Sequence, residues 1–269
     1  MSALAKALED ADEQNRITAI GVVGDLGGVA QQSVLLGILT KAGSPREMQA
    51  AETALAAICS RQTNADASAE KLTASFAQAQ ADAKRSLLCV LRAVGGPKAL
   101  QAVHAAMADT DPAIKDTAMR VLCDWGRVEA APELLALAKS SPNPTYQVLA
   151  LRGYIRTIGD KDLSADKRQA MCNEAATLIQ RDEEKKLLLG ALSNADDAKS
   201  LAVALPYLDN EATKEEASAA AVAISERLVA QNPAVAGDAM KKVLKATKDA
   251  EVLKRARRVL NQTRPKPAK

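Results

Sequence analysis

Few residues in this 269-residue sequence are of types that carry out chemistry, and none has the spacing that chemistry needs. The strongest nucleophiles and metal ligands are one histidine and four cysteines: His104, Cys59, Cys89, Cys123 and Cys172. No two cysteines form the Cys-x-x-Cys pair of a zinc site. Gly27-Gly28 and Gly95-Gly96 lack the other residues of a phosphate-binding loop. We therefore expect no catalytic residue, no cofactor and no metal site, with His104 on the surface or in a groove.

A second set of residues could bind a partner rather than react with a substrate. Stepping about 100° per residue back from the last apolar residue of each second helix places six cations opposite its buried side. These cations, here called the basic ridge, are Arg85, Arg92, Arg120, Arg152, Arg156 and Lys186. Tyr146 shares a predicted helix with two of them, and Arg-Tyr clusters are frequent at interfaces. The pattern predicts a groove for an acidic peptide or another polyanion, with an ordinary solvated helix face as the alternative.

Helices must position these side chains, because apolar residues recur at three- and four-residue steps along almost the whole chain. Of all residues 48% are hydrophobic but only 2% are aromatic, so alanine, leucine and valine must fill the core. No segment alternates as a strand would. The chain is therefore predicted to be all-α, with helices near residues 2–12, 15–26, 29–42, 45–59, 66–81, four between 85 and 139, and then 145–158, 165–181, 183–194, 197–208, 214–229, 234–247 and 250–262.

Helix boundaries are marked by capping residues. Ser44, Asp111 and Asn143 each precede a proline, which suits an N-cap followed by the first helical position. Thr213, followed three residues later by Glu216, has the spacing of a capping box. Pro206 falls inside a predicted helix and should kink it.

The helix pairs repeat at a nearly constant interval. The last large apolar residue of each second helix recurs every 31 to 37 residues: Leu26, Ile58, Val94, Trp125, Ile158, Ala195, Leu228 and Leu260. We expect these positions to be buried, Trp125 among them, and Tyr154 to be largely packed. Such a period is typical of a solenoid of about eight helix pairs, each buried against its neighbours.

The segment from Asp109 to Leu122, DTDPAIKDTAMRVL, resembles the HEAT-repeat pattern of a turn aspartate, a proline, an apolar-basic pair and then a small residue and leucine. The short units look like the bacterial HEAT-like repeats also found in phycobilin lyases. This resemblance implies a right-handed α-α superhelix, similar to armadillo folds, and a family that mostly mediates protein contacts.

Some relatives on HEAT-like scaffolds are enzymes. Hydroxylases of the deoxyhypusine type hold two irons with several His-Glu pairs. Here the single histidine, His104, is followed by Ala105, so this function is not expected. Alkylpurine DNA glycosylases use Asp with Trp, Tyr and Arg in a basic cleft, which Asp124-Trp125 resembles, but the chain has one Trp. A phycobilin-lyase-like function rests on repeat type alone, because a bilin pocket would need more aromatic residues.

The distribution of charge and the chain ends bear on the expected partner and location. Between Lys241 and Lys269 there are eleven basic and two acidic residues, so a polyanion-binding end is an alternative to a solvated cap. No membrane-spanning run or signal-peptide core is visible, which favours the cytoplasm, or an exported context if the chain is a fragment. We expect one HEAT-like domain at residues 1–262, a basic disordered tail at 263–269, and a non-catalytic scaffold for protein-protein interaction. Polyanion binding by the ridge and tail, and an enzyme on a HEAT scaffold, are the alternatives.

Overall fold

The computed structural model describes residues 2–263, and in that range it is helical without any strand. The helices up to Trp125 are α1 (Ser2–Ala7), α2 (Glu13–Leu26), α3 (Val29–Lys41), α4 (Pro45–Ser60), α5 (Ala65–Phe76), α6 (Ala81–Val94), α7 (Gly96–Ala106) and α8 (Pro112–Cys123). Those after it are η1 (Val128–Ala130), α9 (Ala131–Ser140), α10 (Pro144–Ile158), α11 (Ala165–Leu178), α12 (Asp182–Leu192), α13 (Ala198–Ala204), η2 (Leu205–Asp209), α14 (Lys214–Leu228), α15 (Pro233–Ala246) and α16 (Ala250–Gln262). The elements η1 and η2 are short 3₁₀ helices. The predicted tail lies outside the described residues, apart from Thr263.

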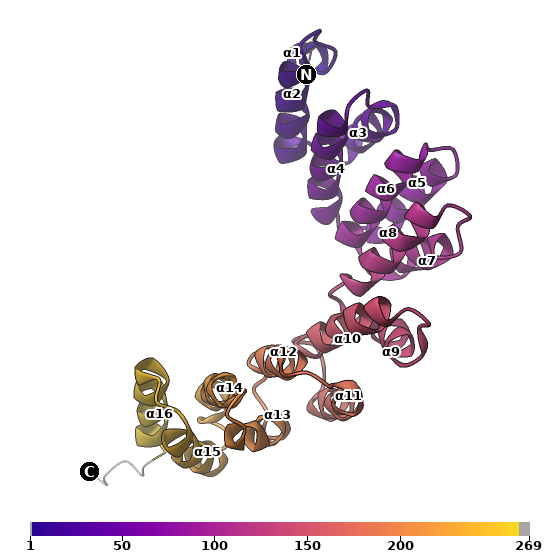
Figure 1. Cartoon of the computed structure of the whole chain (residues 1–269). Helices are drawn as coiled ribbons and strands as arrows, with labels where there is room; N and C mark the ends of the chain where they lie inside the picture. Colours follow the sequence, from indigo (N-terminus) through magenta and orange to yellow (C-terminus); the bar gives the residue numbers. More distant parts are fainter. Residues whose placement is uncertain (1, 264–269) are drawn as a thin grey trace. The chain divides into compact units, whose positions relative to one another are not determined.

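The chain forms two compact units, residues 1–125 and residues 126–269. In the N-terminal unit the even-numbered helices pack in sequence, α2 on α4, α4 on α6 and α6 on α8. The odd-numbered helices α3, α5 and α7 pack against them from one side and make a second layer. In the C-terminal unit α10, α12, α14 and α16 form the same kind of row, with α9, α11, α13 and α15 beside it. Figure 1 shows this alternation of helices along the chain.

Capping side chains begin several helices where the sequence predicts. The side chains of Ser44, Asp111 and Asn143 accept hydrogen bonds from backbone N–H groups in the first turns of α4, α8 and α10. The predicted capping box at Thr213 is wrong, because its hydroxyl donates to the carbonyl of Tyr207 at 3.2 Å and caps nothing. Local hydrogen bonding within the preceding turn therefore outcompetes the helix N-terminus for this side chain.

Two more boundaries differ from the prediction. The first helix ends at Ala7 rather than near residue 12, because Asp12 is the N-cap of α2 and accepts from the N–H groups of Gln14 and Asn15. At Pro206 the chain does not kink within one helix. The α-helix α13 ends at Ala204 and the chain continues as the tighter η2, since proline has no N–H to extend the α-helical bonding.

The predicted burial of the aligned apolar residues is confirmed at the inner positions and wrong at Leu26. Ile58, Val94, Ile158, Ala195 and Leu228 are at most 7% exposed, and so is Trp125. Leu26 is 84% exposed, and Leu260 is half-buried. Both belong to the outermost even-numbered helices, which have an even-numbered neighbour on one side only among the described residues. Leu26 is also the last residue of α2, directly before the C-cap Gly27.

A buried arginine joins the loops of the C-terminal unit. Arg168 on α11 is 4% exposed. Its guanidinium donates to the carbonyls of Ile158, Asp160 and Leu163 at 3.0 to 3.2 Å and to the carboxylate of Asp197 at 2.8 Å. Because Asp197 also caps α13, one side chain holds the end of α10, the following loop and the start of α13. Its donors have the partners that a buried guanidinium requires.

The buried indole gives a test of the packing. Replacing Trp125 by Ala should lower the free energy of unfolding by about 3–5 kcal/mol, because a large side chain is lost from a site that is 3% exposed. Urea denaturation followed by circular dichroism measures this loss, with Trp125→Phe as a milder control. A loss below about 1 kcal/mol would show that the indole contributes little to the core.

Candidate functional site

The residues of the predicted basic ridge lie on the solvent side of their helices. Arg85, Arg92 and Arg120 are exposed in the N-terminal unit, on α6 and α8. In the C-terminal unit Arg156 and Lys186 are exposed and Arg152 is half-buried, on α10 and α12. Tyr146 is half-buried near the start of α10, whereas Tyr154 is 3% exposed, as predicted. All six cations therefore lie away from the core, as the helical spacing predicts.

Carboxylates neutralise most of this ridge. Arg85 pairs with Asp82 one turn earlier on α6, and Nε of Arg120 lies 2.8 Å from Oδ2 of Asp116 on α8. Arg92 donates to the backbone carbonyl of Asp124 at 3.5 Å. Exposed pairs of this kind contribute little stability, but they cancel the local charge. The carboxylate partners of Arg85 and Arg120 lie three and four residues earlier on the same helix, at spacings that bring helical side chains together.

Other cations bond across neighbouring even-numbered helices. Arg152 of α10 donates from Nε and Nη2 to Oε1 of Glu184 of α12, at 3.0 and 2.9 Å. Lys186 of α12 lies 3.0 Å from Oε1 of Glu216 of α14. The N-terminal unit contains a similar pair, since Nε of Arg16 on α2 lies 3.0 Å from Oε1 of Glu47 on α4. Glu184 and Glu47 are 2% and 8% exposed, so these arginines compensate buried carboxylates, a structural role.

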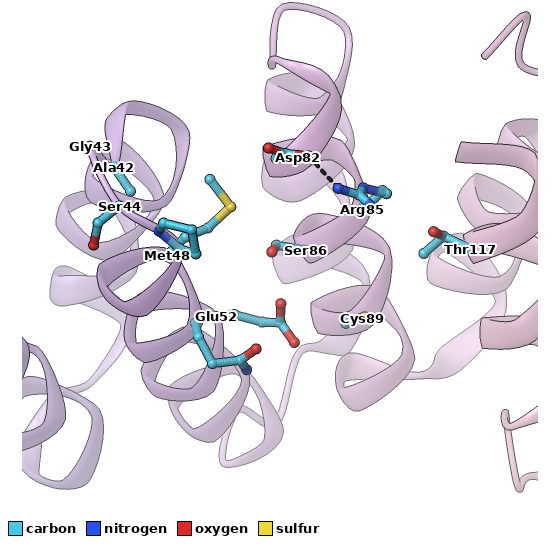
Figure 2. A pocket seen from close by; sticks show the side chains of 12 residues that line it. Ala42, Gly43, Ser44, Met48, Glu52, Asp82, Arg85, Ser86, Cys89 and Thr117 are labelled. Atoms are coloured by element: carbon cyan, nitrogen blue, oxygen red, sulfur yellow. Dashed lines mark hydrogen bonds and ion pairs between the residues drawn. The ribbon is translucent and has the colours of Figure 1, made fainter. Parts of the chain in front are cut away.

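A groove on the N-terminal unit is the best candidate for a binding site. It has a volume of about 530 Å³ and lies on the open face of α4, α6 and α8. Figure 2 shows Asp82, Ser86 and Cys89 on successive turns of α6, with Met48 and Glu52 facing them from α4. Thr117 of α8 lies at its far side. The groove is open, and the thioether of Met48 lies in it together with hydroxyls and carboxylates.

Glu52 is the charged group of this groove without an ion pair among residues 2–263. Asp82 is engaged by Arg85, and Ser44 at the rim donates to Glu13 of α2. The neighbour of Glu52 is the thiol of Cys89 on the facing helix. A signal for Glu52 exists in the sequence: it lies six residues before Ile58, just as Arg152 lies six residues before Ile158. The charge at this register is therefore negative on α4 and positive on α10.

The Cys89 thiol is poorly suited to nucleophilic chemistry. Burial, and secondly the negative charge of Glu52, raise its pKa from 9.0 to about 11. Burial also raises the pKa of Cys59 and Cys172 to about 11. Because the thiolate is the reactive form, these cysteines are almost entirely protonated near neutral pH. The groove can therefore hold a ligand by contact and charge, while its cysteine resists reaction.

Other residue types with chemical potential are dispersed. His104 is exposed on α7, away from this groove. The ring of Trp125, at 3% exposed, offers little surface to a ligand. Within residues 2–263, no three His, Cys, Asp or Glu side chains are grouped to hold a metal ion, and no helix has the length and apolar character to cross a membrane.

Comparisons with known proteins do not assign a family. No protein-family model matches the sequence, and no curated protein is similar to it. One similar solved structure is an engineered protein, at 18% identity over 97% of this chain and 95% of that chain, with a TM-score of 0.24. Another comes from the computational design of self-assembling cyclic homo-oligomers, at 15% identity, 97% and 87% coverage and a TM-score of 0.17.

A ridge arginine that pairs with a buried carboxylate should contribute more to stability than one in an exposed pair within a single helix. Arg152→Ala leaves a buried Glu184 carboxylate without its cation and should cost about 2–4 kcal/mol of unfolding free energy. Arg85→Ala removes an exposed pair within one helix and should change stability by less than about 0.5 kcal/mol. Urea denaturation of both variants tests this; equal small losses would contradict a structural role for Arg152.

The raised pKa of Cys89 predicts slow alkylation. At pH 7 its reaction with iodoacetamide should be about a hundredfold slower than that of an ordinary thiol, because a pKa about two units higher leaves about a hundredth of the thiolate. Glu52→Gln should speed it, since loss of the negative charge lowers the thiol pKa, whereas Asp82→Asn should not. Peptide-resolved mass spectrometry measures the rates. An ordinary rate in the wild-type protein would refute the assignment.

Proposed function

We propose that this chain is a HEAT-like α-solenoid of about eight helix pairs, with a right-handed superhelix, that acts as a non-catalytic scaffold for protein-protein interaction. The repeated rows of even-numbered helices support the solenoid part of this proposal. The interaction surface is the open face of α4, α6 and α8. The residues of the basic ridge contribute paired charges to such faces rather than a continuous positive field.

The observation that carries the function is the chemistry of the groove on α4, α6 and α8. It is open, and its lining combines the Met48 thioether with hydroxyls and carboxylates. Small-molecule sites are usually concave pockets that enclose most of their ligand, and this groove does not enclose one. A segment of another protein can instead lie along it and exchange water for both apolar and polar contacts.

Polyanion binding has one specific observation in its favour. A cleft of about 900 Å³ between η2 and α15 is lined by Lys214, Lys242 and Lys245. Lys214 is paired with Glu211, whereas Lys242 and Lys245 have no ion pair among the described residues. This cleft, rather than the ridge, is where an anionic polymer would meet uncompensated positive charge. Asp209 also lines it, which limits the attraction.

A matched pair of variants tests the scaffold proposal. Gln49 lies at the groove edge on α4 and Gln101 lies on α7 in the other layer, and both are exposed. Gln49→Arg should weaken binding to a partner captured from the native cell by about tenfold or more, and Gln101→Arg should leave it unchanged. Both variants add the same charge, so a difference reports the groove. Affinity is measured with the purified partner.

The contrary result is also specific. If both variants bind the partner equally well, the groove is not the interaction surface. If the protein is instead retained on heparin with a steep salt dependence, and Lys242→Gln with Lys245→Gln abolishes the retention, the polyanion function is supported in place of the scaffold.

A further inference from the structure

A second groove adjoins the first along α4. It has a volume of about 600 Å³ and lies between α2 and α4. Pro45 and Gln49 line both grooves, so the two share α4 as a common wall. Since α2 packs on α4 and α4 on α6, the N-terminal unit carries two neighbouring grooves that share one helix.

The α2–α4 groove is largely apolar and is lined mainly by small side chains. Ile17 and Gly21 of α2 face Ala50, Ala54 and Ala57 of α4 across it. A Cβ added at Gly21 would have no atom within 4 Å, so the groove is open above that residue. Its charged members, Asp25 and Arg46, carry opposite signs, and Arg46 donates to the side chain of Gln14 at 3.1 Å. An aliphatic side chain suits these walls better than a charged or large aromatic one.

The α4–α6 groove has the opposite character. Its charged members are Glu52, Asp82 and Arg85, and Arg85 is occupied by Asp82. Glu52 is therefore left as a negative charge that points toward α6 without a cation (Figure 2). A lysine or arginine of a partner would compensate it, and an acidic side chain would be repelled. At this groove the expected partner is therefore basic, whereas the basic ridge predicts an acidic one.

We propose that this surface binds an extended segment of a partner protein that carries an aliphatic residue and, about three residues away, a lysine or arginine. The aliphatic side chain occupies the α2–α4 groove, and the cation pairs with Glu52 in the α4–α6 groove. The spacing follows from packed helices about 10 Å apart and an extended chain that advances about 3.3 Å per residue. This inference rests on the proposed scaffold function and specifies the chemistry of the partner.

The experiment selects random peptides from a display library on the full chain and compares the consensus between variants. Wild-type protein should select an aliphatic and a basic residue about three positions apart. Glu52→Lys should convert the basic preference to an acidic one and leave the aliphatic preference. Gly21→Leu should fill the first groove and remove the aliphatic preference, and it replaces a helical glycine by a better helix former, so folding is retained.

Affinity measurements with one peptide test the same proposal quantitatively. A synthetic peptide of the selected sequence should bind Glu52→Lys at least about tenfold more weakly than wild type. Glu9→Lys, an exposed charge reversal in the same unit that lines neither groove, should bind within about twofold of wild type. Circular dichroism of each variant confirms that it is folded.

The outcomes separate this inference from the function on which it rests. Peptides that bind the wild-type protein and not the Gln49→Arg variant, but show no basic or aliphatic preference, would overturn the proposed partner chemistry. The groove would still be a binding site. An acidic consensus would also overturn the proposed partner chemistry. If no peptide that depends on Gln49 is selected, the groove does not bind extended segments, and the scaffold function assigned to it fails as well.

Discussion

Close contact between neighbouring even-numbered helices is the interaction on which each unit depends. A Cβ at Gly24 of α2 would lie 2.7 Å from the backbone of Ala54 on α4, so these two helices approach nearer than larger side chains would permit. On α4 the adjacent Leu55 and Ile58 are fully buried. Small residues bring the helices together, and branched aliphatic residues then fill the remaining space. This arrangement explains how a chain with few aromatic residues still builds a core.

Charge has a secondary part in this architecture, and it acts locally. Arg152 and Arg16 neutralise glutamates that the packing has already buried, and Arg168 satisfies loop carbonyls. Cations used in this way are not available to an acidic ligand. In the groove on α4, α6 and α8 the charged residue that remains to attract a partner is Glu52, because it has no ion pair among the described residues. The charge that a surface presents to a partner thus depends on which charged groups the fold leaves uncompensated. The number of arginines on a face does not determine it.

Much of the fold could be predicted from the sequence, because helix period, capping residues and repeat spacing are local signals. The inner aligned positions such as Ile58 and Ile158 are buried as the register requires. The prediction for Leu26 is wrong, because it is the last residue of α2 and the helical period does not encode whether a terminal turn is covered. Thr213 was mispredicted because its hydroxyl has a competing carbonyl at Tyr207. The site was harder to predict, since whether Arg152 is free depends on a carboxylate 32 residues away.

The buried glutamates at the starts of α4 and α12 impose a matching rule on the order of the repeats. Glu47 and Glu184 each receive an arginine from the even-numbered helix before them. Loss of the helix pair that supplies the arginine, by deletion within the gene, would strand a carboxylate in the core even if every helix still packed. Pairs that carry such a glutamate can therefore be duplicated or exchanged only behind a pair that brings the arginine. The ion pairs between successive even-numbered helices thus restrict which helix pairs can be neighbours.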